Sequence, residues 1–196
     1  MGLFLQTAIL PECGEAQARS AVEAVAKKLS GLEKGDKAYE LMNLIPEECQ
    51  YKEYGGGAGI LFNEDCSGYE NLAEAISKET EKPILLLYIY DGDYWGYFLY
   101  DKGVEIDRFN PIPDYFEEVS EEQMEKEKGN AEIIARYFHV EKADIEKYLR
   151  FWTEEELEEG QEKAYEDDEF SAGEDWQIAD FMRKLGYPYE AWGEEE

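Results

Sequence analysis

The stretch from Ile84 to Phe109 constrains the fold most, because β-rich runs follow one another there with only short gaps between them. The runs ILLLYIY, YWGYFLY and VEIDRF are rich in aromatic and β-branched residues, which pack well on a pleated sheet. Each gap carries a glycine, at Asp91-Gly92 and at Lys102-Gly103, and glycine supplies the positive φ that tight hairpins need. The stretch is therefore predicted to be an antiparallel meander. Its first strand lacks alternation and should be buried on both faces.

The residues before this meander alternate between strand and helix patterns. Apolar residues recur either at the spacing of one helix face or in short extended runs. The predicted elements are a strand at Gly2–Ile9, a helix at Ala18–Leu29 that stops at Gly31, short extended pieces at 39–45 and 49–54, a strand at Gly57–Phe62, and a helix at Tyr69–Ile76 in a segment that Pro83 closes.

The residues after the meander favour helices. Pro111 and Pro113 remove donors from a β-ladder, so the chain is expected to leave the sheet there. Capping signals and apolar stripes then follow. The predicted elements are a helix opened by the Ser120…Gln123 capping box, a helix capped by Asn130 and carrying Ile133–Phe138, a helical stripe at Ile145–Trp152, and a last helix opened by Ser171 and Glu174 and stopped by Gly186.

These patterns together predict an α+β fold, namely an antiparallel meander-containing sheet with N-terminal β-α units and a C-terminal helical segment. A chain of 196 residues suits one domain, since domains usually hold about 100 to 200 residues. Within 1–196 we expect a sheet-rich part at 1–110, a helical part at 111–187 and an acidic tail at 188–196.

Charge limits the partners of the chain. It has 48 Asp and Glu residues against 19 Lys and Arg residues, and its formal net charge is −29. Nucleic acids and anionic membranes are bound mainly through Lys and Arg, so neither is an expected partner. A basic protein partner fits this charge. The alternative is that the acidity only keeps the protein soluble and monomeric.

A cytoplasmic location is predicted. The cysteines Cys13, Cys49 and Cys66 are odd in number and form no Cys-x-x-Cys pair, so a disulfide framework is not expected. The opening MGLFLQTAIL has no positive n-region and no small-residue cleavage site, which favours a strand over a signal peptide. No apolar run has the length of a transmembrane helix.

The motifs that could carry chemistry have simpler structural interpretations. The glycines of 55–59 lack the Lys-Ser/Thr of a phosphate loop and precede a strand, which favours a hinge or bulge. His139 is the single histidine and falls at the end of a predicted helix, where it complements the helix dipole. The paired helices expected within 131–152 are too acidic for a DNA reader, and the acidic run 154–169 lacks the calcium-loop pattern. No catalytic residue, metal site or cofactor is therefore predicted.

Aromatic residues of the meander are candidates for a binding surface. Trp95 and Tyr97 share one face of the second strand, and Asp114 and Tyr115 follow the third. If helices cover only one face of the sheet, the other face would be an aromatic patch ringed by carboxylates. Core packing is the alternative for many of these rings, and the sequence leaves open which of them are exposed.

Several short pieces of the C-terminal half form a pattern, KAYxDDEF…W…DFMRKLG, together with earlier fragments. They are Tyr94-Trp95-Gly96-Tyr97 with Gly103, Phe109-Asn110, Pro113-Asp114-Tyr115-Phe116, Lys128-Gly129-Asn130, Lys163-Ala164-Tyr165, Asp167-Asp168-Glu169-Phe170, Trp176, and Asp180-Phe181-Met182-Arg183-Lys184-Leu185-Gly186. With these pieces, 94–187 resembles an uncharacterised bacterial protein family that has no assigned activity. The resemblance therefore implies no functional residues. The small acidic chain is also similar, loosely, to bacterial immunity proteins that block basic toxin enzymes.

The carboxylates of this pattern allow two interpretations. Asp180 and Arg183 are three apart on a predicted helix and can pair, so Asp167 and Asp168 can belong to a loop that this pair anchors. Alternatively, these carboxylates and Asp114 meet in a cleft. The candidate binding residues are accordingly Trp95, Tyr97, Asp114, Tyr115, Asp167, Asp168, Asp180 and Arg183.

The leading hypothesis is a non-enzymatic interaction or inhibitor module, immunity-like in character, that binds a basic protein. The alternative is a carboxylate-based hydrolase dependent on a divalent metal, with Asp114, Asp167, Asp168 and Asp180 in its site. A row of carboxylates that mimics DNA ranks below both. The sequence leaves the identity of the partner and the oligomeric state open.

Overall fold

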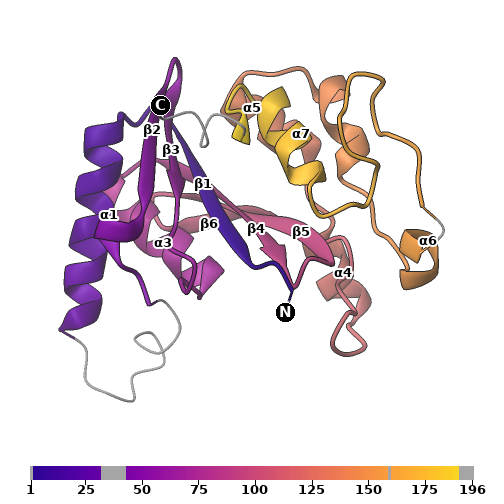
Figure 1. Ribbon diagram of the computed structural model, residues 1–196, viewed down its shortest axis with the longest axis horizontal. Coiled ribbons are helices and arrows are strands. Elements are labelled where there is room, and N and C mark those ends of the chain that lie inside the picture. The colour runs from indigo at the N-terminus through magenta and orange to yellow at the C-terminus, as the bar shows by residue number, and fades with distance from the viewer. Residues whose placement is uncertain (1, 32–42, 159, 190–196) are drawn as a thin grey trace. The chain divides into compact units, whose positions relative to one another are not determined.

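The computed structural model describes residues 2–31, 43–158 and 160–189 (Figure 1). Its strands are β1 (Leu5–Pro11), β2 (Gln50–Tyr54), β3 (Gly57–Leu61), β4 (Pro83–Tyr90), β5 (Tyr94–Asp101) and β6 (Val104–Phe109). In the described residues they form one six-stranded antiparallel sheet with the order β2-β3-β1-β4-β5-β6. The predicted meander is confirmed as β4, β5 and β6, and the α+β class is confirmed with it.

Helices precede and follow the meander. The α-helices are α1 (Glu15–Ser30), α3 (Tyr69–Thr80), α4 (Glu121–Glu127), α5 (Ala131–Phe138), α6 (Glu154–Glu158) and α7 (Gln177–Lys184). Single 3-10 turns are η1 (Pro46–Glu48), η2 (Lys142–Asp144) and η3 (Glu146–Tyr148). Within the described part of the chain, no helix is both long enough and apolar enough to cross a lipid bilayer.

The strand β1 lies inside the sheet, between β3 and β4. It pairs antiparallel with β3, with Ile9 opposite Gly59, and β3 pairs antiparallel with β2, with Ile60 opposite Tyr51. The helix α1 connects β1 to β2, and α3 connects β3 to β4. This connectivity and the order β2-β3-β1-β4 are those of a split β-α-β, ferredoxin-like arrangement, which β5 and β6 extend beyond β4.

The chain divides into two compact units. The N-terminal unit contains, among the described residues, 5–31, 43–88 and 98–106, and the C-terminal unit contains 2–4, 89–97, 107–158 and 160–189. The division crosses β4, β5 and β6, so each unit contains parts of these strands. The expected single domain, with its parts at 1–110, 111–187 and 188–196, stays a prediction.

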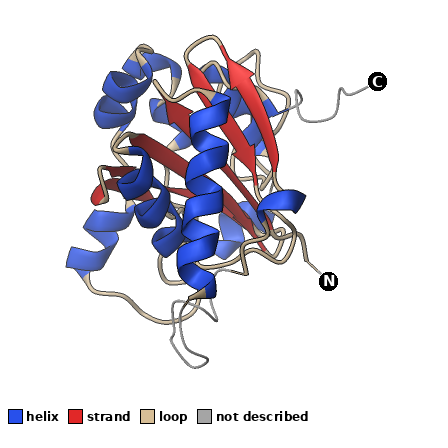
Figure 2. Ribbon diagram, turned by 90° about the vertical axis from the view of Figure 1, so that its left-hand side faces the viewer, coloured by secondary structure: helices blue, strands red, loops and turns tan. Residues whose placement is uncertain are grey.

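The core of the N-terminal unit lies between its helices and strands. The helix α1 packs against α3, β2 and β3, and Figure 2 shows it in front of the strands. Its buried face comprises Ala18, Ala21, Val22 and Val25, which confirms the predicted periodicity. Residues 84–88 of β4 are all at most 5% exposed, so this strand is buried on both faces as predicted. Each large side chain buried in this way contributes roughly 1.5–3 kcal/mol.

Several predicted boundaries in the N-terminal half are wrong. The first strand begins at Leu5 and runs to Pro11 instead of spanning Gly2–Ile9. Pro83 does not close the helical segment but starts β4, where a first strand residue can lack an N–H. The extended piece at 49–54 is β2, whereas 43–45 form no strand and 39–42 fall outside the described residues. The glycine run contributes a two-residue turn between β2 and β3.

In the C-terminal half the caps predicted at Ser120 and Asn130 are confirmed. Ser120 and Gln123 form the capping box of α4, and the Asn130 side chain accepts hydrogen bonds at the start of α5. His139 ends α5 in the left-handed region, with φ of 57°. Gly186, with φ of 87°, follows the end of α7.

One predicted helix and the start of another are wrong. The stripe at 145–152 forms no α-helix, because the backbone breaks at Ile145, with φ of −130°, into the turns η2 and η3. The pair of helices expected within 131–152 therefore lacks its second helix. The last helix starts at Gln177 and not at Ser171, because Gly173 takes φ of 87°, which an α-helix does not allow.

The cysteines lie in the core and are free, as the sequence predicts. Burial raises the pKa of Cys13 to about 11 and that of Cys66 to about 12, and it also raises the pKa of Cys49. The thiolate is the reactive form of cysteine, so raising its pKa and burying it both suppress reaction.

We expect dithionitrobenzoate at pH 8 to label the native chain at least about 100-fold more slowly than the urea-unfolded chain, since a pKa shift of two units leaves a hundredth of the thiolate. The raised pKa values also link the stability of the fold to pH. The stability that the buried thiols contribute is present below the ordinary thiol pKa of 9.0 and is lost as the pH rises through the raised values. Fast stoichiometric labelling of the native chain would contradict the buried placement.

Candidate functional site

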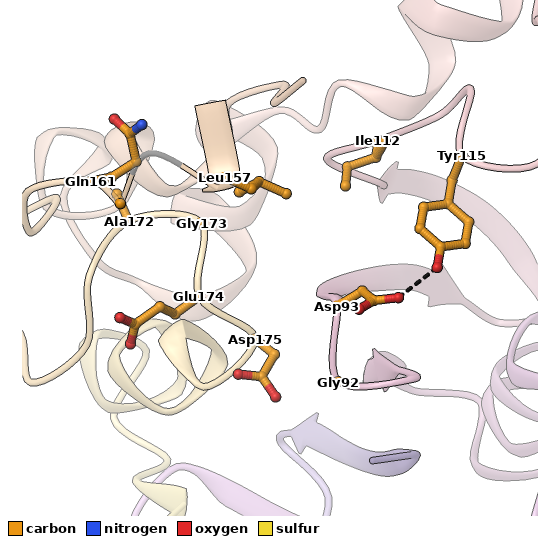
Figure 3. A pocket seen from close by; sticks show the side chains of 11 residues that line it. Gly92, Asp93, Ile112, Tyr115, Leu157, Gln161, Ala172, Gly173, Glu174 and Asp175 are labelled. Atoms are coloured by element: carbon orange, nitrogen blue, oxygen red, sulfur yellow. Dashed lines mark hydrogen bonds between the residues drawn. The ribbon is translucent and has the colours of Figure 1, made fainter. Parts of the chain in front are cut away.

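A pocket of about 490 Å³ opens in the C-terminal unit. Four segments line it: the turn after β4, the loop after β6, the end of α6 with the residues that follow, and the loop before α7. The lining residues are Gly92, Asp93, Ile112, Tyr115, Leu157, Gly160, Gln161, Ala172, Gly173, Glu174 and Asp175. Figure 3 shows Tyr115 and Asp93 on one side of the hollow, and Leu157, Ala172 and Asp175 on the other.

The turn between β4 and β5 brings Asp93 to the pocket. Asp91 and Gly92 have φ of 53° and 75°, which is the pattern of a tight hairpin turn. The Gly92 N–H donates to the carbonyl of Leu3 at 2.9 Å, and the Asp93 N–H donates to that of Tyr90 at 2.9 Å. The turn is close to the opposite wall, because a Cβ on Gly92 would lie 4.0 Å from Asp175 Oδ2.

The loop after β6 is held by local and long-range hydrogen bonds. The Asn110 side chain accepts from the Ile112 N–H at 3.0 Å, and the Tyr115 N–H donates to the Ile112 carbonyl at 3.1 Å. The Tyr115 hydroxyl donates to Asp93 Oδ2, which joins two walls of the pocket (Figure 3). This hydrogen bond is the main cause that raises the pKa of Tyr115 to about 12, so the hydroxyl stays protonated at neutral pH.

The loop before α7 presents Asp175. Its Oδ1 accepts a hydrogen bond from the Trp176 N–H at 2.8 Å. Burial raises the pKa of Asp175 above its usual range; the Trp176 N–H opposes that shift, and the negative charges of Glu174 and Asp93 add to it. Asp175 is thus a partly desolvated carboxylate that faces other carboxylates.

The described residues that line the pocket include acidic groups and no Lys or Arg. Among the described residues, no ion pair within 4.0 Å neutralises Asp93, Glu174 or Asp175. In the same part of the chain, no three Asp, Glu, His or Cys side chains are grouped as a metal ion would need. The arrangement is therefore suited to attract an extended cationic group.

An aromatic patch adjoins this pocket through Tyr115. The patch, defined as Phe4, Tyr90, Tyr94, Tyr115 and Phe116, belongs wholly to the C-terminal unit. Phe4 and Phe116 pack edge-on against Tyr90, with ring centroids 5.2 and 5.4 Å away. Phe116 is 70% exposed and Phe4 is 43% exposed. Exposed aromatic rings in fixed contact with one another are typical of interaction surfaces.

The structure places Trp95 and Tyr97 in the interior, at 2% and 0% exposure. Both rings pack against Phe181 of α7, at centroid distances of 5.1 and 6.1 Å. The Tyr97 hydroxyl donates to Asp107 Oδ2 at 2.7 Å, and the Trp95 indole N–H donates to Gln177 Oε1 at 3.3 Å. Both side chains therefore pack against α7 in the interior, and neither ring is exposed at the surface.

Asp168 and Asp180 are also buried, at 3% and 0% exposure, and they anchor the 165–170 loop. Asp168 accepts hydrogen bonds from the Tyr148 hydroxyl and from the Tyr165 N–H at 2.9 Å. Burial, and then the hydrogen bond to Asp168, raise the pKa of Tyr148. Asp180 accepts from the N–H groups of Glu169 and Phe170, at 3.0 and 2.8 Å.

Asp167 and Arg183 lie at the rim of the same loop. Asp167 pairs with Lys184 at 2.6 Å, and this hydrogen-bonded pair lowers the pKa of Asp167. Arg183 donates to the Asp167 carbonyl at 3.0 Å and pairs with Asp180. The structure thus brings Asp167, Asp168, Asp180 and Arg183 together. Asp114 is exposed beside Tyr115, and no hydrogen bond or ion pair of a described residue joins it to that group.

Tyr115 is the one predicted binding residue that lines the pocket. Sequence reasoning missed Phe4, Phe116, Asp93 and Asp175 as site residues. The local signal for Asp93 was its position in a hairpin turn, which places a polar side chain at the end of a strand. No local signal connects it with Asp175, because the two belong to segments far apart in the sequence.

Comparisons of the chain with protein-family models, with curated proteins and with solved structures give no match. The resemblance of 94–187 to an uncharacterised bacterial family therefore stays a prediction. The chemistry of the pocket and of the aromatic patch carries the functional information, since function depends on a site and not on the fold around it.

Proposed function

We propose that this protein is a non-enzymatic interaction module, inhibitory and immunity-like in character, that binds a basic protein through the aromatic patch and the acidic pocket. One observation carries the proposal: Phe116, which is 70% exposed, contacts Tyr115, whose hydroxyl donates to Asp93 in a pocket whose described lining residues include no Lys or Arg. An apolar anchor beside unneutralised carboxylates complements a basic partner that also has an apolar contact surface.

The net charge and the patch would act at different stages of binding. A formal charge of −29 attracts a basic protein over a distance and speeds encounter, an effect that salt screens. Affinity comes instead from a few well-packed anchors near the centre of an interface, and aromatic rings are frequent among them. Phe116 and Phe4 have this character, because their contacts with Tyr90 limit the freedom that binding would remove.

The hydrolase alternative receives less support from the geometry. Both oxygens of Asp168 and both oxygens of Asp180 accept hydrogen bonds inside the protein. These bonds fix the 165–170 loop, so the two carboxylates serve the fold. Asp167 is paired with Lys184, and Asp114 lies beside the aromatic patch. The carboxylates named for that alternative thus have structural partners or lie apart.

The proposal is tested by capture of partners from the cells that make the protein, followed by calorimetric titration of the purified partner. Phe116→Ala is expected to weaken binding by about 2 kcal/mol, or roughly 30-fold, which is the usual loss at an aromatic anchor. Val104→Ala is the matched control, because Val104 is also exposed, at 62%, but lies on β6 in the N-terminal unit. It should change affinity by less than about twofold.

Salt provides a second readout of the same complex. Raising the ionic strength from about 0.05 to 0.5 M should slow association more than it speeds dissociation, since screening acts mainly on long-range steering. A captured partner that is itself acidic, or equal losses for Phe116→Ala and Val104→Ala, would remove the proposal.

A further inference from the structure

We infer that the pocket lined by Asp93 and Asp175 receives an arginine side chain of the partner, with its guanidinium group between the two carboxylates. The inference rests on the proposed function and adds the chemical group that the site recognises.

The pocket is large enough for a long side chain, and its acidic groups are too dispersed to bind a single metal ion. Its volume of about 490 Å³ is well above that of a water molecule. Ligand pockets usually measure about 300–1,000 Å³. No trio of metal-ligating side chains is grouped within the described residues, so the acidic groups do not converge on one point. An elongated cation fits this geometry.

The walls match the two parts of an arginine side chain. Ile112, Leu157 and Ala172 provide apolar surface, which suits the methylene stem. Asp93 and Asp175 lie on opposite sides of the hollow (Figure 3). A guanidinium group has five N–H donors in one plane and can serve two carboxylates at once. The ring of Tyr115, held by its bond to Asp93, offers a face on which such a plane can stack.

The empty pocket is electrostatically unfavourable, which is a usual property of binding sites. Asp175 is half-buried, and Asp93 and Glu174 are the acidic groups that destabilise its charged form. The Tyr115 hydroxyl, the other titratable group in the lining, is neutral and already bonded to Asp93. A bound cation would neutralise charges that no described residue neutralises.

The test uses small probes and needs no identified partner. N-acetyl-arginine amide is titrated into the isotope-labelled full chain, and the backbone amide signals are followed by NMR. We expect saturable shifts at Gly92, Asp93, Gly173 and Asp175, with a dissociation constant on the order of 1 mM. N-acetyl-citrulline amide has nearly the same shape without the charge and should give no saturable shift. Equal binding of citrulline, or of the corresponding lysine amide, would overturn the guanidinium assignment.

Asp175→Asn should weaken binding of the arginine probe at least about tenfold, because one charge-assisted partner is lost. The Asn side chain retains the oxygen that accepts from Trp176, so the loop keeps its hydrogen bond. The melting temperature of the variant should be no lower than that of the wild type. Burial disfavours the charged form of Asp175, and the variant removes that charge. Glu117→Gln is the control: Glu117 is exposed, lies outside the lining, and its replacement removes the same charge.

The two proposals fail separately. If the arginine probe gives no saturable shift while partner binding still depends on Phe116, the pocket inference falls and the proposed function stands. If the probe binds in an Asp175-dependent way but the partner's affinity is insensitive to Phe116→Ala, the guanidinium site stands and the proposed mode of protein binding falls. If Asp175→Asn and Glu117→Gln weaken binding of the probe equally, the effect is one of general charge, and the proposed site is overturned.

Discussion

Replacing Asp180 by alanine is expected to destabilise the C-terminal unit by about 3–5 kcal/mol, the range found when one member of a buried, hydrogen-bonded charge pair is removed. Asp180 is fully buried and accepts from the N–H groups of Glu169 and Phe170. It also pairs with Arg183 of the same helix. The variant leaves two backbone donors without their acceptor and removes the carboxylate that pairs with Arg183, and water reaches that interior only if the loop opens.

Urea unfolding followed by tryptophan fluorescence measures this loss. The tryptophans that the structure describes, Trp95, Trp152 and Trp176, all belong to the C-terminal unit, so the signal reports on that unit. Asp167→Ala is the matched control, because Asp167 is a neighbouring carboxylate of the same loop whose side chain is 69% exposed. Its midpoint should stay close to that of the wild type. Similar midpoints for Asp167→Ala and Asp180→Ala would disprove the anchoring role.

Replacing Gly129 by alanine is expected to cost about 2–4 kcal/mol, from backbone strain and from overpacking together. Gly129 has φ of 67°, a conformation that L side chains rarely adopt. A Cβ there would lie 2.8 Å from Tyr97 Oη and 3.1 Å from Phe109 Cβ. Relief of this contact requires Tyr97 to move, and its hydroxyl donates to Asp107, which also accepts from the Asn130 N–H at 2.9 Å.

Gly186→Ala separates the two contributions. Gly186 also has positive φ, 87°, but nothing lies within 4 Å of a Cβ at that position. It should therefore show only the conformational cost, about 1 kcal/mol. Both variants are compared with the wild type by thermal and urea unfolding. If Gly129→Ala loses no more than Gly186→Ala, then the contact with Tyr97 is too soft to matter.

Short-range patterns predicted the local elements well, because the interactions that form them lie within a few residues. The meander, the capping box at Ser120 and the cap at Asn130 are of this kind. The start of the last helix was misplaced for a local reason, because Gly173 takes a positive φ. The helix predicted at 145–152 involves a long-range contact, because the Tyr148 hydroxyl donates to Asp168 of a later loop. Helical spacing alone gives no information about such contacts.

The candidate site was less predictable than the fold. The sequence indicated an acidic, aromatic surface but not which rings are exposed. Alternation along β5 does not distinguish a strand that is buried on both faces from a strand that is buried on one face. Trp95 and Tyr97 are interior residues, whereas Phe116 on the following loop is exposed. The pocket depends on the meeting of 92–93 with 172–175, and that meeting is a property of the tertiary structure.

The position of β1 inside the sheet has a consequence for synthesis on the ribosome. This strand is made before both of its neighbours, β3 and β4, which end only at Leu61 and Tyr90. At roughly 5–20 residues per second, the ribosome needs about 4 to 16 seconds to complete the second neighbour. During that interval a nascent strand with unpaired edges is a natural client for chaperones, and rare codons between β1 and β4 would prolong its exposure.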